Sequence, residues 1–563
     1  MEMITERLSL ADDGSSDARM RAVDNEKLYL NYIDETQNPF LSNISLPWPY
    51  IIVESYLGKC IQVMASVLPY VHVVEEDDDS RVKARRVEKD ANMVLYTQKW
   101  PIFSYNAYKQ AFKYPCAFIW VRPWGNYFGK EMPILQLMNF FHVYVNPSVL
   151  TLDDSDAYLI YEAYVPKRII QQFAGNPYYK NINKVELHEG QIYTPEEEEI
   201  QAIKEKSSYT EDKYSELVKV HYYWSHNDFI MMTNDDNIIR DDRQNFLGRI
   251  PVKVIKPIPI DNEFYGMSIL EEGKQLFAEI NENRNQFNDA ANIMLNPQYI
   301  VDRERAGLKT RTINSRAGNL IFTDDVNAIL PQRQDWQLLM MALRRQGVIE
   351  NDIMNYSNAF PQLRGQQVAG TETATEYMGM RSAGELRSDT YNLLLAMMGV
   401  EDIVKDIVEY KRMFMTDSSQ FYYWPEQRTE KVTPEDYEGQ FTYKCFAGFK
   451  HTQDIERKQM IEAMTLVFGG ANGAFLPFVM PKAEEWLDRL LDTFPEIRSP
   501  EQLRLSEEER MMAQNQAMVQ QFMQSMMGGG GQQALPNLGE KAMRMPESTP
   551  NAPMAPTMGS MNV

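Results

Sequence analysis

The residue types that most often bind metals or transfer protons are present in this sequence, but they form no recognisable catalytic group. The acidic run from Glu75 to Asp79 lacks the alternating oxygen ligands and the glycine turn of a calcium loop. His221 and His226 are the closest pair among six histidines, yet a spacing of five in a strand places them on opposite faces. The sequence therefore predicts a solvated acidic turn and no metal site.

A phosphate-binding loop is also missing from the sequence. The glycine run from Gly528 to Gly531 is not followed by Lys-Ser or Lys-Thr, and Gly-x-x-x-x-Gly-Lys occurs nowhere in the 563 residues. This counts against an ATP-driven motor. Paired carboxylates are common among 79 acidic residues, but spacing alone nominates none as a nuclease centre. We predict that the protein is not an enzyme and needs no cofactor.

One cluster of positive charge stands out in a chain whose net charge is -22. Its members are Arg303, Arg305, Lys309, Arg311 and Arg316. The cluster suits a docking surface on which complementary charge sets the association rate and register. It equally suits ordinary exposed side chains that pair with nearby acids such as Asp302 and Asp324. The sequence leaves both interpretations open.

A polar loop from Tyr356 to Gly370 contains Pro361 and Gly365, which prevent a regular element. Its candidate ligand-binding side chains are Gln362, Arg364, Gln366 and Gln367. Such groups can contact phosphates without reading base sequence. The alternative interpretation is an exposed loop without a ligand.

Two predicted helices flank a short strand-rich insert and precede this loop. Ser268 and Glu271 would form a capping box for the first helix, which ends at Pro297, and the second begins at Asp335. The apolar side chains expected to pack in this hairpin are Leu276, Phe277, Ile280, Phe287, Leu339 and Leu343. The opposite face of the first helix is polar, with Asn281, Glu282, Asn285, Asn288 and Asn292. Helices with so few apolar residues usually pack against copies of themselves.

A third predicted helix follows the loop, with Thr373 and Glu376 as its capping box. Gly379, Gly384 and Gly399 interrupt it, and each interior glycine costs about 1 kcal/mol relative to alanine. We therefore expect this helix to bend. Methionine is frequent here, and its adaptable side chain fits either plain core packing or an interface that shifts between states.

The order of these elements resembles the portal, or head-to-tail connector, proteins of tailed bacteriophages. The resemblance rests on Tyr265-Gly266-Met267-Ser268-Ile269-Leu270 after Arg249-Ile250-Pro251-Val252, on the hairpin with its insert and loop, and on Thr373-Ala374-Thr375-Glu376 opening a long helix. The segment from Ala91 to Trp100, followed by Ala107 to Trp120, is similar to part of the portal wing. The resemblance implies an α+β subunit with a mixed α/β wing, a two-helix stem, a small β-containing clip, a long kinked helix and a helical C-terminal crown.

The resemblance divides the chain into regions. These are an N-terminal arm (1–29), a first wing part (30–265), a stem helix (266–296), the clip (297–333), a second stem helix (334–355), the tunnel loop (356–372), the kinked helix and wing return (373–450) and the crown (451–527). The composition of residues 528–563, rich in Gly, Gln, Pro and Met, predicts a disordered tail.

The resemblance also implies a function without chemistry. Portals form a ring, usually a dodecamer, at one capsid vertex of the virion, and double-stranded DNA passes through it without sequence specificity during packaging, retention and ejection. The implied partners are terminase, the major capsid and scaffolding proteins and a tail adaptor, with the basic cluster as a docking site and the Gln/Arg loop facing DNA. The alternatives are a DNA-packaging ATPase or nuclease, and a neck adaptor or scaffold.

Composition sets independent bounds on function. The charge of -22 disfavours a protein that grips DNA across a broad basic face, but it is compatible with a conduit through which a polyanion slides. Cys60, Cys116 and Cys445 lie far apart and indicate reduced, buried thiols. The polar N-terminus is no signal peptide, and no apolar run is long enough to span a membrane. We expect a protein made in the host cytoplasm, with no membrane partner.

Several alternating segments predict strands. Four of them, Phe140 to Val145, Ala157 to Ala163, Leu217 to Trp224 and Pro251 to Val254, are expected to form the wing sheet, and two more follow at Phe421 to Trp424 and Phe441 to Phe446.

Overall fold

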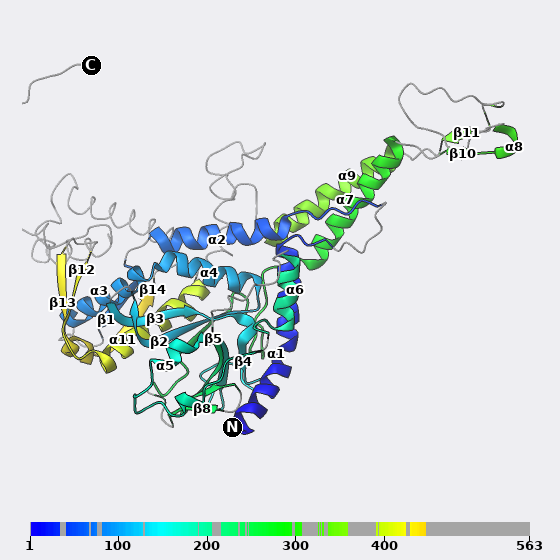
Figure 1. Ribbon diagram of the computed structural model, residues 1–563. Coiled ribbons are helices and arrows are strands. Elements are labelled where there is room, and N and C mark those ends of the chain that lie inside the picture. The colour runs from blue at the N-terminus through cyan, green and yellow to red at the C-terminus, as the bar shows by residue number, and fades with distance from the viewer. Residues whose placement is uncertain are drawn as a thin grey trace, which may run out of the picture. The chain divides into compact units, whose positions relative to one another are not determined.

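The computed structural model shows helices interspersed with antiparallel sheets (Figure 1). It describes residues 2–33, 41–66, 69–75, 81–127, 130–189, 191–204, 216–234, 237–242, 245, 247–295, 299–306, 325, 327, 329–331, 336–357, 390–391, 393–423 and 428–445. The predicted α+β class is confirmed.

The chain begins with α1 (Glu2–Tyr29), a segment to which the sequence interpretation gave no secondary structure. Its buried stripe is built from Ile4 and from small residues at helical spacing, Ala11, Ala18 and Ala22. The small side chains let α1 lie close to its neighbours: a Cβ on Gly14 would come 2.6 Å from Pro147 Cβ. Alanine is a weak marker of an apolar face, and this is why the sequence predicted only a polar arm.

The larger sheet contains five antiparallel strands. Their order is β4 (Val143–Val145), β5 (Tyr158–Pro166), β6 (Leu217–Ser225), β7 (Phe229–Thr233) and β8 (Asn237–Asp242). β5 and β6 pair from Tyr158 opposite Ser225 to Pro166 opposite Leu217. The 3₁₀ turn η2 (Phe140–His142) directly precedes β4, and the short helices α5 (Lys167–Gln171), η3 (Ile182–Lys184) and α6 (Pro195–Ile203) lie between β5 and β6.

A smaller sheet has the order β3 (Lys130–Leu137), β2 (Ala117–Tyr127), β9 (Val252–Ile255). The prediction that Pro251 to Val254 joins the same sheet as the other three segments is therefore wrong. β9 instead pairs with β2, from Ala117 opposite Ile255 to Trp120 opposite Val252. Alternation identifies a strand but not its neighbour, because pairing is fixed by contacts distant in sequence.

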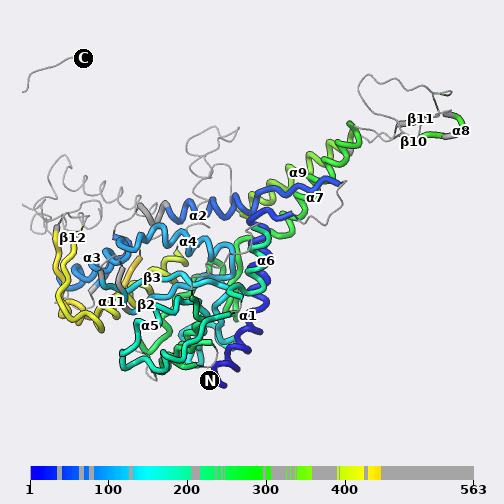
Figure 2. The backbone as a smooth tube through the Cα atoms, viewed as in Figure 1, coloured from blue at the N-terminus to red at the C-terminus, as the bar shows by residue number. Residues whose placement is uncertain are grey.

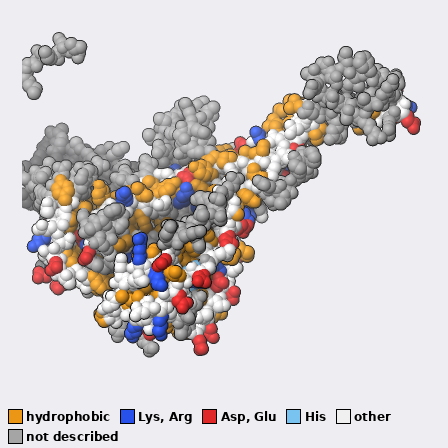
Figure 3. Space-filling model, in the orientation of Figure 1, with side chains coloured by type: hydrophobic (Ala, Val, Ile, Leu, Met, Phe, Trp, Pro, Cys, Tyr) orange, Lys and Arg blue, Asp and Glu red, His pale blue; other side chains and the backbone are white. Residues whose placement is uncertain are grey.

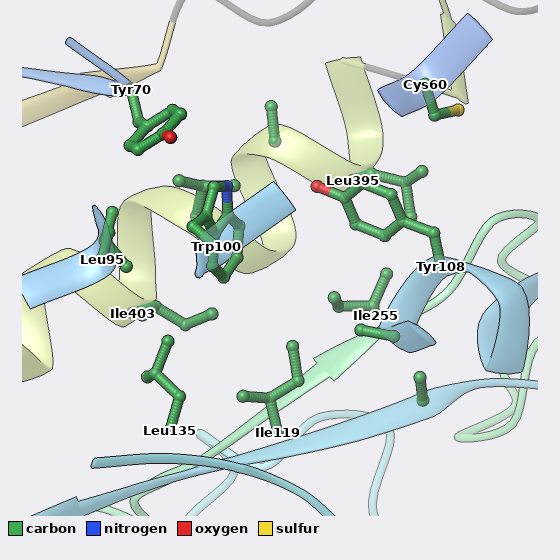
Figure 4. Close-up of a cluster of buried hydrophobic side chains, with 14 of the residues drawn as sticks. Cys60, Tyr70, Leu95, Trp100, Tyr108, Ile119, Leu135, Ile255, Leu395 and Ile403 are labelled. Carbon is green, nitrogen blue, oxygen red and sulfur yellow. The ribbon is translucent and has the colours of Figure 1, made fainter. Parts of the chain in front are cut away.

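The main core lies between the smaller sheet and helices α2 (Trp48–Ser66), α3 (Arg81–Thr97), α4 (Trp100–Lys113) and α11 (Asp402–Phe414). Trp100 and Tyr108 are fully buried there, among Ile119, Leu135, Ile255, Leu395 and Ile403 (Figure 4). Gly399, one of the glycines expected to bend the third helix, lies in a π-helical segment, η6 (Ala396–Glu401). A Cβ on Gly399 would come 3.1 Å from Ile255 Cδ1, so glycine allows the helix to approach β9.

Two small sheets complete the described fold. β1 (Val71–Glu75) pairs with β14 (Phe441–Cys445), and β12 (Ser419–Tyr423) pairs with β13 (Arg428–Val432). The sequence predicted two strands after residue 415, separated by a turn at Pro434. The structure has β13 as a third strand, and a 3₁₀ turn, η8 (Pro434–Glu438), follows it.

Ion pairs join distant parts of this fold. Figure 2 shows the yellow α11 beside segments from the first half of the chain. Arg249, just before β9, lies 3.0 Å from Asp406 and 2.7 Å from Glu409 of α11. Lys253 lies 3.0 Å from the second oxygen of the fully buried Asp406. Because Asp406 has cations on both oxygens, its burial is compensated.

Candidate functional site

A helical hairpin contains many of the residues that the sequence predicted to be functional. α7 (Lys274–Leu295) and α9 (Trp336–Ser357) lie side by side (Figure 1). Asn283 Nδ2 donates to the carbonyl of Ala342 at 3.1 Å, and Arg345 pairs with Glu279 at 2.8 Å. Residues further along α7 meet residues earlier in α9, so the helices are antiparallel.

The first stem helix begins later than predicted. The reciprocal half of the capping box is present, since Glu271 Oε1 accepts from the Ser268 amide at 2.9 Å. The Ser268 hydroxyl accepts from the amide of Leu270 at 3.2 Å and itself donates to the carbonyl of Phe112 at 2.6 Å. Residues 269–273 form tight turns, and the α-helix starts at Lys274 instead of residue 266.

The base of the hairpin is part of the main core. We call residues 269–280 and 349–357 the hairpin root. Phe277, Ile280, Ile349 and Ile353 are buried there. A Cβ on Gly273 would come 2.6 Å from the Tyr356 ring, so glycine leaves room for this ring of α9 just before α7 begins. The root is therefore fixed by packing within one chain.

An extended segment, residues 41–46, lies along α7, and we call it the strap. Its alternate amides donate to side chains spaced four apart on α7: Ser42 to Asp289 at 2.7 Å, Ile44 to Asn285 at 2.8 Å and Leu46 to Asn281 at 2.8 Å. Asn285 also donates to the carbonyl of Ile44 at 3.2 Å. Two extended residues span about 6.6 Å and four helical residues about 6 Å, so the two spacings match.

The strap was missed by the sequence interpretation, which assigned Asn281 and Asn285 to a polar face without a partner. The available signal was the four-residue spacing of Asn281, Asn285 and Asp289. An amide that both donates and accepts suits a backbone partner better than it suits solvent. Nothing in residues 41–46 themselves marks them as this partner.

The rest of the hairpin, residues 281–295 and 336–348, exposes large apolar side chains; we call it the outer hairpin (Figure 3). Leu295 is 78% exposed, Met341 63% and Val348 59%. Among the side chains predicted to pack in the stem, Phe277 and Ile280 are buried, Leu276, Phe287 and Leu339 are half-buried, and Leu343 is exposed. An apolar surface of this kind usually marks an interaction site.

The predicted clip is described only in part. β10 (Tyr299–Val301) and β11 (Ile329–Pro331) pair antiparallel, and Arg303 and Arg305 lie in the single turn α8 (Arg303–Ala306). Arg305 is exposed and lies 3.7 Å from Asp302, as the ion-pair interpretation of the cluster expects. The remaining cluster members, Lys309, Arg311 and Arg316, lie outside the described residues.

Other predicted sites also lie outside the described residues. These are the loop side chains Gln362, Arg364, Gln366 and Gln367, the capping pair Thr373 and Glu376, most of the acidic run after Glu75, the crown and the tail. Their roles stay predictions.

A buried polar network lies on the larger sheet. Glu162 of β5 accepts from His221 at 3.2 Å and from Tyr164 at 2.7 Å, and Lys219 lies 3.1 Å away. His142 Nε2 lies 2.8 Å from Glu197 of α6. The histidines are far apart in sequence, so the sequence interpretation treated them as scattered. Cross-strand pairing of β5 and β6 brings Glu162 opposite His221, and sequence spacing does not show this pairing.

The network shifts the ionisation of its members. Burial alone would lower the pKa of His142, but the carboxylates of Glu162, 3.6 Å from its Nδ1, and of Glu197 raise it to about 9. Burial opposes ionisation of Glu162 as well, yet the neighbouring His142, His221 and Lys219 hold its pKa well below the usual range. His142 is therefore a buried cation held between two carboxylates, and it ties α6 to the sheet.

The remaining metal-binding and nucleophilic side chains of the described residues form no further site of this kind. Among the described residues, no three His, Cys, Asp or Glu side chains form a set suited to a metal ion. Cys60 and Cys116 are buried, and burial raises the pKa of the Cys116 thiol well above its ordinary value. Within the described helices, none is long and apolar enough to cross a membrane.

The sequence was also compared with known proteins. No model of a known protein family matches the chain, and no curated protein matches it.

Proposed function

We propose that this protein is a phage portal subunit that forms a ring-shaped channel for DNA at one capsid vertex. The observation that supports the proposal is the hairpin: two antiparallel helices rooted in the core, with an apolar outer part and a small two-stranded tip. A free subunit would expose this apolar surface to water. Packing of copies around a common axis would bury it and enclose a channel.

The proposed role requires positioning and no covalent chemistry. The root holds α7 and α9 at a fixed place in the fold, and the outer hairpin provides the stem that neighbouring subunits share. The tip, with Arg303 and Arg305 in α8, is the proposed docking surface for terminase and later for the tail adaptor. The net charge of -22 favours a channel wall that does not bind the DNA tightly.

Electron microscopy of the purified full chain tests this proposal. Class averages along the symmetry axis are expected to show a closed ring of about twelve subunits with an opening wide enough for duplex DNA. Monomers or dimers at every protein concentration would contradict it. ATP hydrolysis or metal-dependent DNA cleavage by the same preparation would support the packaging enzyme, and a ring without an open centre would support a neck adaptor.

A further inference from the structure

The outer hairpin has two edges on opposite sides. Asn283 of α7 bonds to α9, whereas Asn281 and Asn285, two residues to either side of it, bond to the strap. Two residues turn a helix by about 200°. The strap and α9 therefore lie on opposite faces of α7, and the order across the hairpin is strap, α7, α9.

The edge formed by α9 carries an apolar row. Ala342 bonds to α7, and Ile349 is buried in the core. Met340 precedes Ala342 by two residues, and Gly347 precedes Ile349 by two residues. Because two residues turn a helix by about 200°, Met340 and Gly347 lie on the face of α9 away from α7. Trp336, Met340, Leu343 and Gly347 recur at spacings of four, three and four and form one stripe, which we call the α9 row. Trp336 is 59% exposed and Leu343 41% exposed.

The edge formed by the strap is also apolar. Its alternate amides bond to α7, and its Leu41 and Ile44 side chains are 58% and 44% exposed. Ile44 bonds to Asn285, and Asn283 bonds to Ala342. Ile44 and Leu343 therefore lie at about the same height along the hairpin, on its opposite edges.

The two edges carry opposite charges next to their apolar side chains. Arg344 is exposed beside the α9 row, and Glu282 is exposed beside the side chains that hold the strap. Asn283 bonds to Ala342, and the two helices run antiparallel, so Glu282 is level with Leu343, one residue from Arg344. One edge is apolar with a cation, and the other is apolar with an anion at the matching level.

From these complementary edges we infer that, in the assembled protein, the α9 row of each subunit packs on the strap of the next subunit, with Arg344 of one beside Glu282 of the other. The inference rests on the proposed ring and names the surfaces that close it. A ring of more than two subunits needs two different surfaces that fit each other. The strap and the α9 row meet this need because they lie on opposite sides of one rigid hairpin.

Gly347 fits the same arrangement. A Cβ at this position would meet nothing within 4 Å in the chain, so packing within the subunit does not require glycine. A glycine inside a helix costs up to about 1 kcal/mol relative to alanine. In the inferred contact, the absence of a side chain at Gly347 lets the strap of the neighbouring subunit approach α9 closely.

Disulfide trapping in the full-length chain tests the inference. The double variant Ile44→Cys/Leu343→Cys is oxidised mildly and run on a non-reducing gel. The expected result is loss of most of the monomer band and a ladder of multimers. The matched control is Ile44→Cys/Arg345→Cys, because Arg345 neighbours Arg344 but pairs with Glu279 of its own α7. The two single-cysteine variants at positions 44 and 343 report the background from Cys60, Cys116 and Cys445.

The outcomes separate this inference from the proposed function. Rings in the microscope without a ladder from the first pair would overturn the contact and leave the ring in place. A ladder that stops at dimers, or one equally strong in the control pair, would also overturn it. Monomers with neither rings nor a ladder would overturn both the contact and the proposed function.

Discussion

The root and the outer part of the hairpin belong to the same two helices, but their apolar side chains have different surroundings. In the root, Phe277, Ile280 and Ile353 are buried in the core of one subunit. In the outer part, Trp336 and Leu343 are exposed on the same helix that buries Ile353. The root is therefore fixed within the fold, and the outer part carries the exposed apolar side chains that the proposed ring would bury.

This division makes a separation of effects possible. Substitutions in the root should lower the free energy of unfolding of a subunit at any protein concentration. Substitutions in the outer hairpin should leave that free energy nearly unchanged and alter the concentration at which subunits assemble, because assembly depends on mass action.

The largest effect is expected in the root. Phe277→Ala should lower the free energy of unfolding by about 3 to 5 kcal/mol, since it removes a buried ring and leaves a cavity. Leu343→Ala is the control, and at protein concentrations too low for assembly it should cost less than about 1 kcal/mol. Urea unfolding of both variants gives the comparison. Equal losses in dilute solution would mean that the two regions are not distinct.

A second effect belongs to the larger sheet and should depend on pH but not on assembly. His142 has an ordinary pKa of about 6.5, and its pKa in the fold is raised to about 9. Its ion pairs therefore stabilise the fold fully below pH 6.5, and this contribution is lost as the pH rises through 9. The gap in unfolding free energy between the wild type and His142→Asn should shrink by roughly 3 kcal/mol over this range. A gap that stays constant with pH would show that His142 is not a buried cation.

The charged pair between neighbouring edges should have a moderate effect on assembly. Arg344→Glu would place two carboxylates together, and we expect a roughly tenfold rise in the concentration needed to form rings, equivalent to about 1.4 kcal/mol. Adding Glu282→Arg should restore assembly. Arg305→Glu, at the tip, is the control and should change nothing in sedimentation. Failure of the double variant to recover would count against the pairing.

Loss of the hydrogen bonds that one α7 side chain makes to the strap should have a smaller effect. Asn285→Ala removes the bonds to both the amide and the carbonyl of Ile44 and should weaken the strap by about 1 to 2 kcal/mol. Hydrogen exchange of residues 41–46 measures this directly. Asn292→Ala is the control, because Asn292 is exposed and lies beyond the residues that bond to the strap. Equally fast exchange of the strap in both variants would contradict the role of these hydrogen bonds.

The smallest effect on the subunit has the opposite sign. Gly347→Ala should raise the stability of the isolated subunit by up to about 1 kcal/mol through helix propensity. The same methyl group should hinder the approach of the neighbouring strap and weaken assembly. Thermal unfolding should show a higher melting temperature for the subunit, and sedimentation should show weaker assembly. A variant with both higher stability and stronger assembly would contradict the close approach inferred at Gly347.

The sequence predicted features that depend on local pattern and missed those that depend on distant contacts. Both hairpin helices follow from three- and four-residue spacing of apolar side chains, and the strand-rich tip follows from short apolar runs bounded by turn residues. The strap, the sheet joined by β9 and the pairing of Glu162 with His221 join residues that are far apart in sequence. No local rule identifies such partners.

The sequence also underrated small and polar residues. The buried stripe of α1 is built largely from alanines, which resemble a polar arm in composition. Asn281 and Asn285 were predicted only as members of a polar helix face, and Asp289 was not singled out. In both helices, whether a residue is buried or bonded depends on the segment that packs against it and not on the residue type alone.

A high-resolution reconstruction of the purified full chain by electron microscopy is the most direct test of the claim that the outer hairpin joins neighbouring subunits. The account predicts a closed ring in which every outer hairpin lies between two others, with Leu343 against Ile44 of the adjacent copy. A stable monomer, or a ring in which Trp336 and Leu343 remain exposed to solvent, would contradict it.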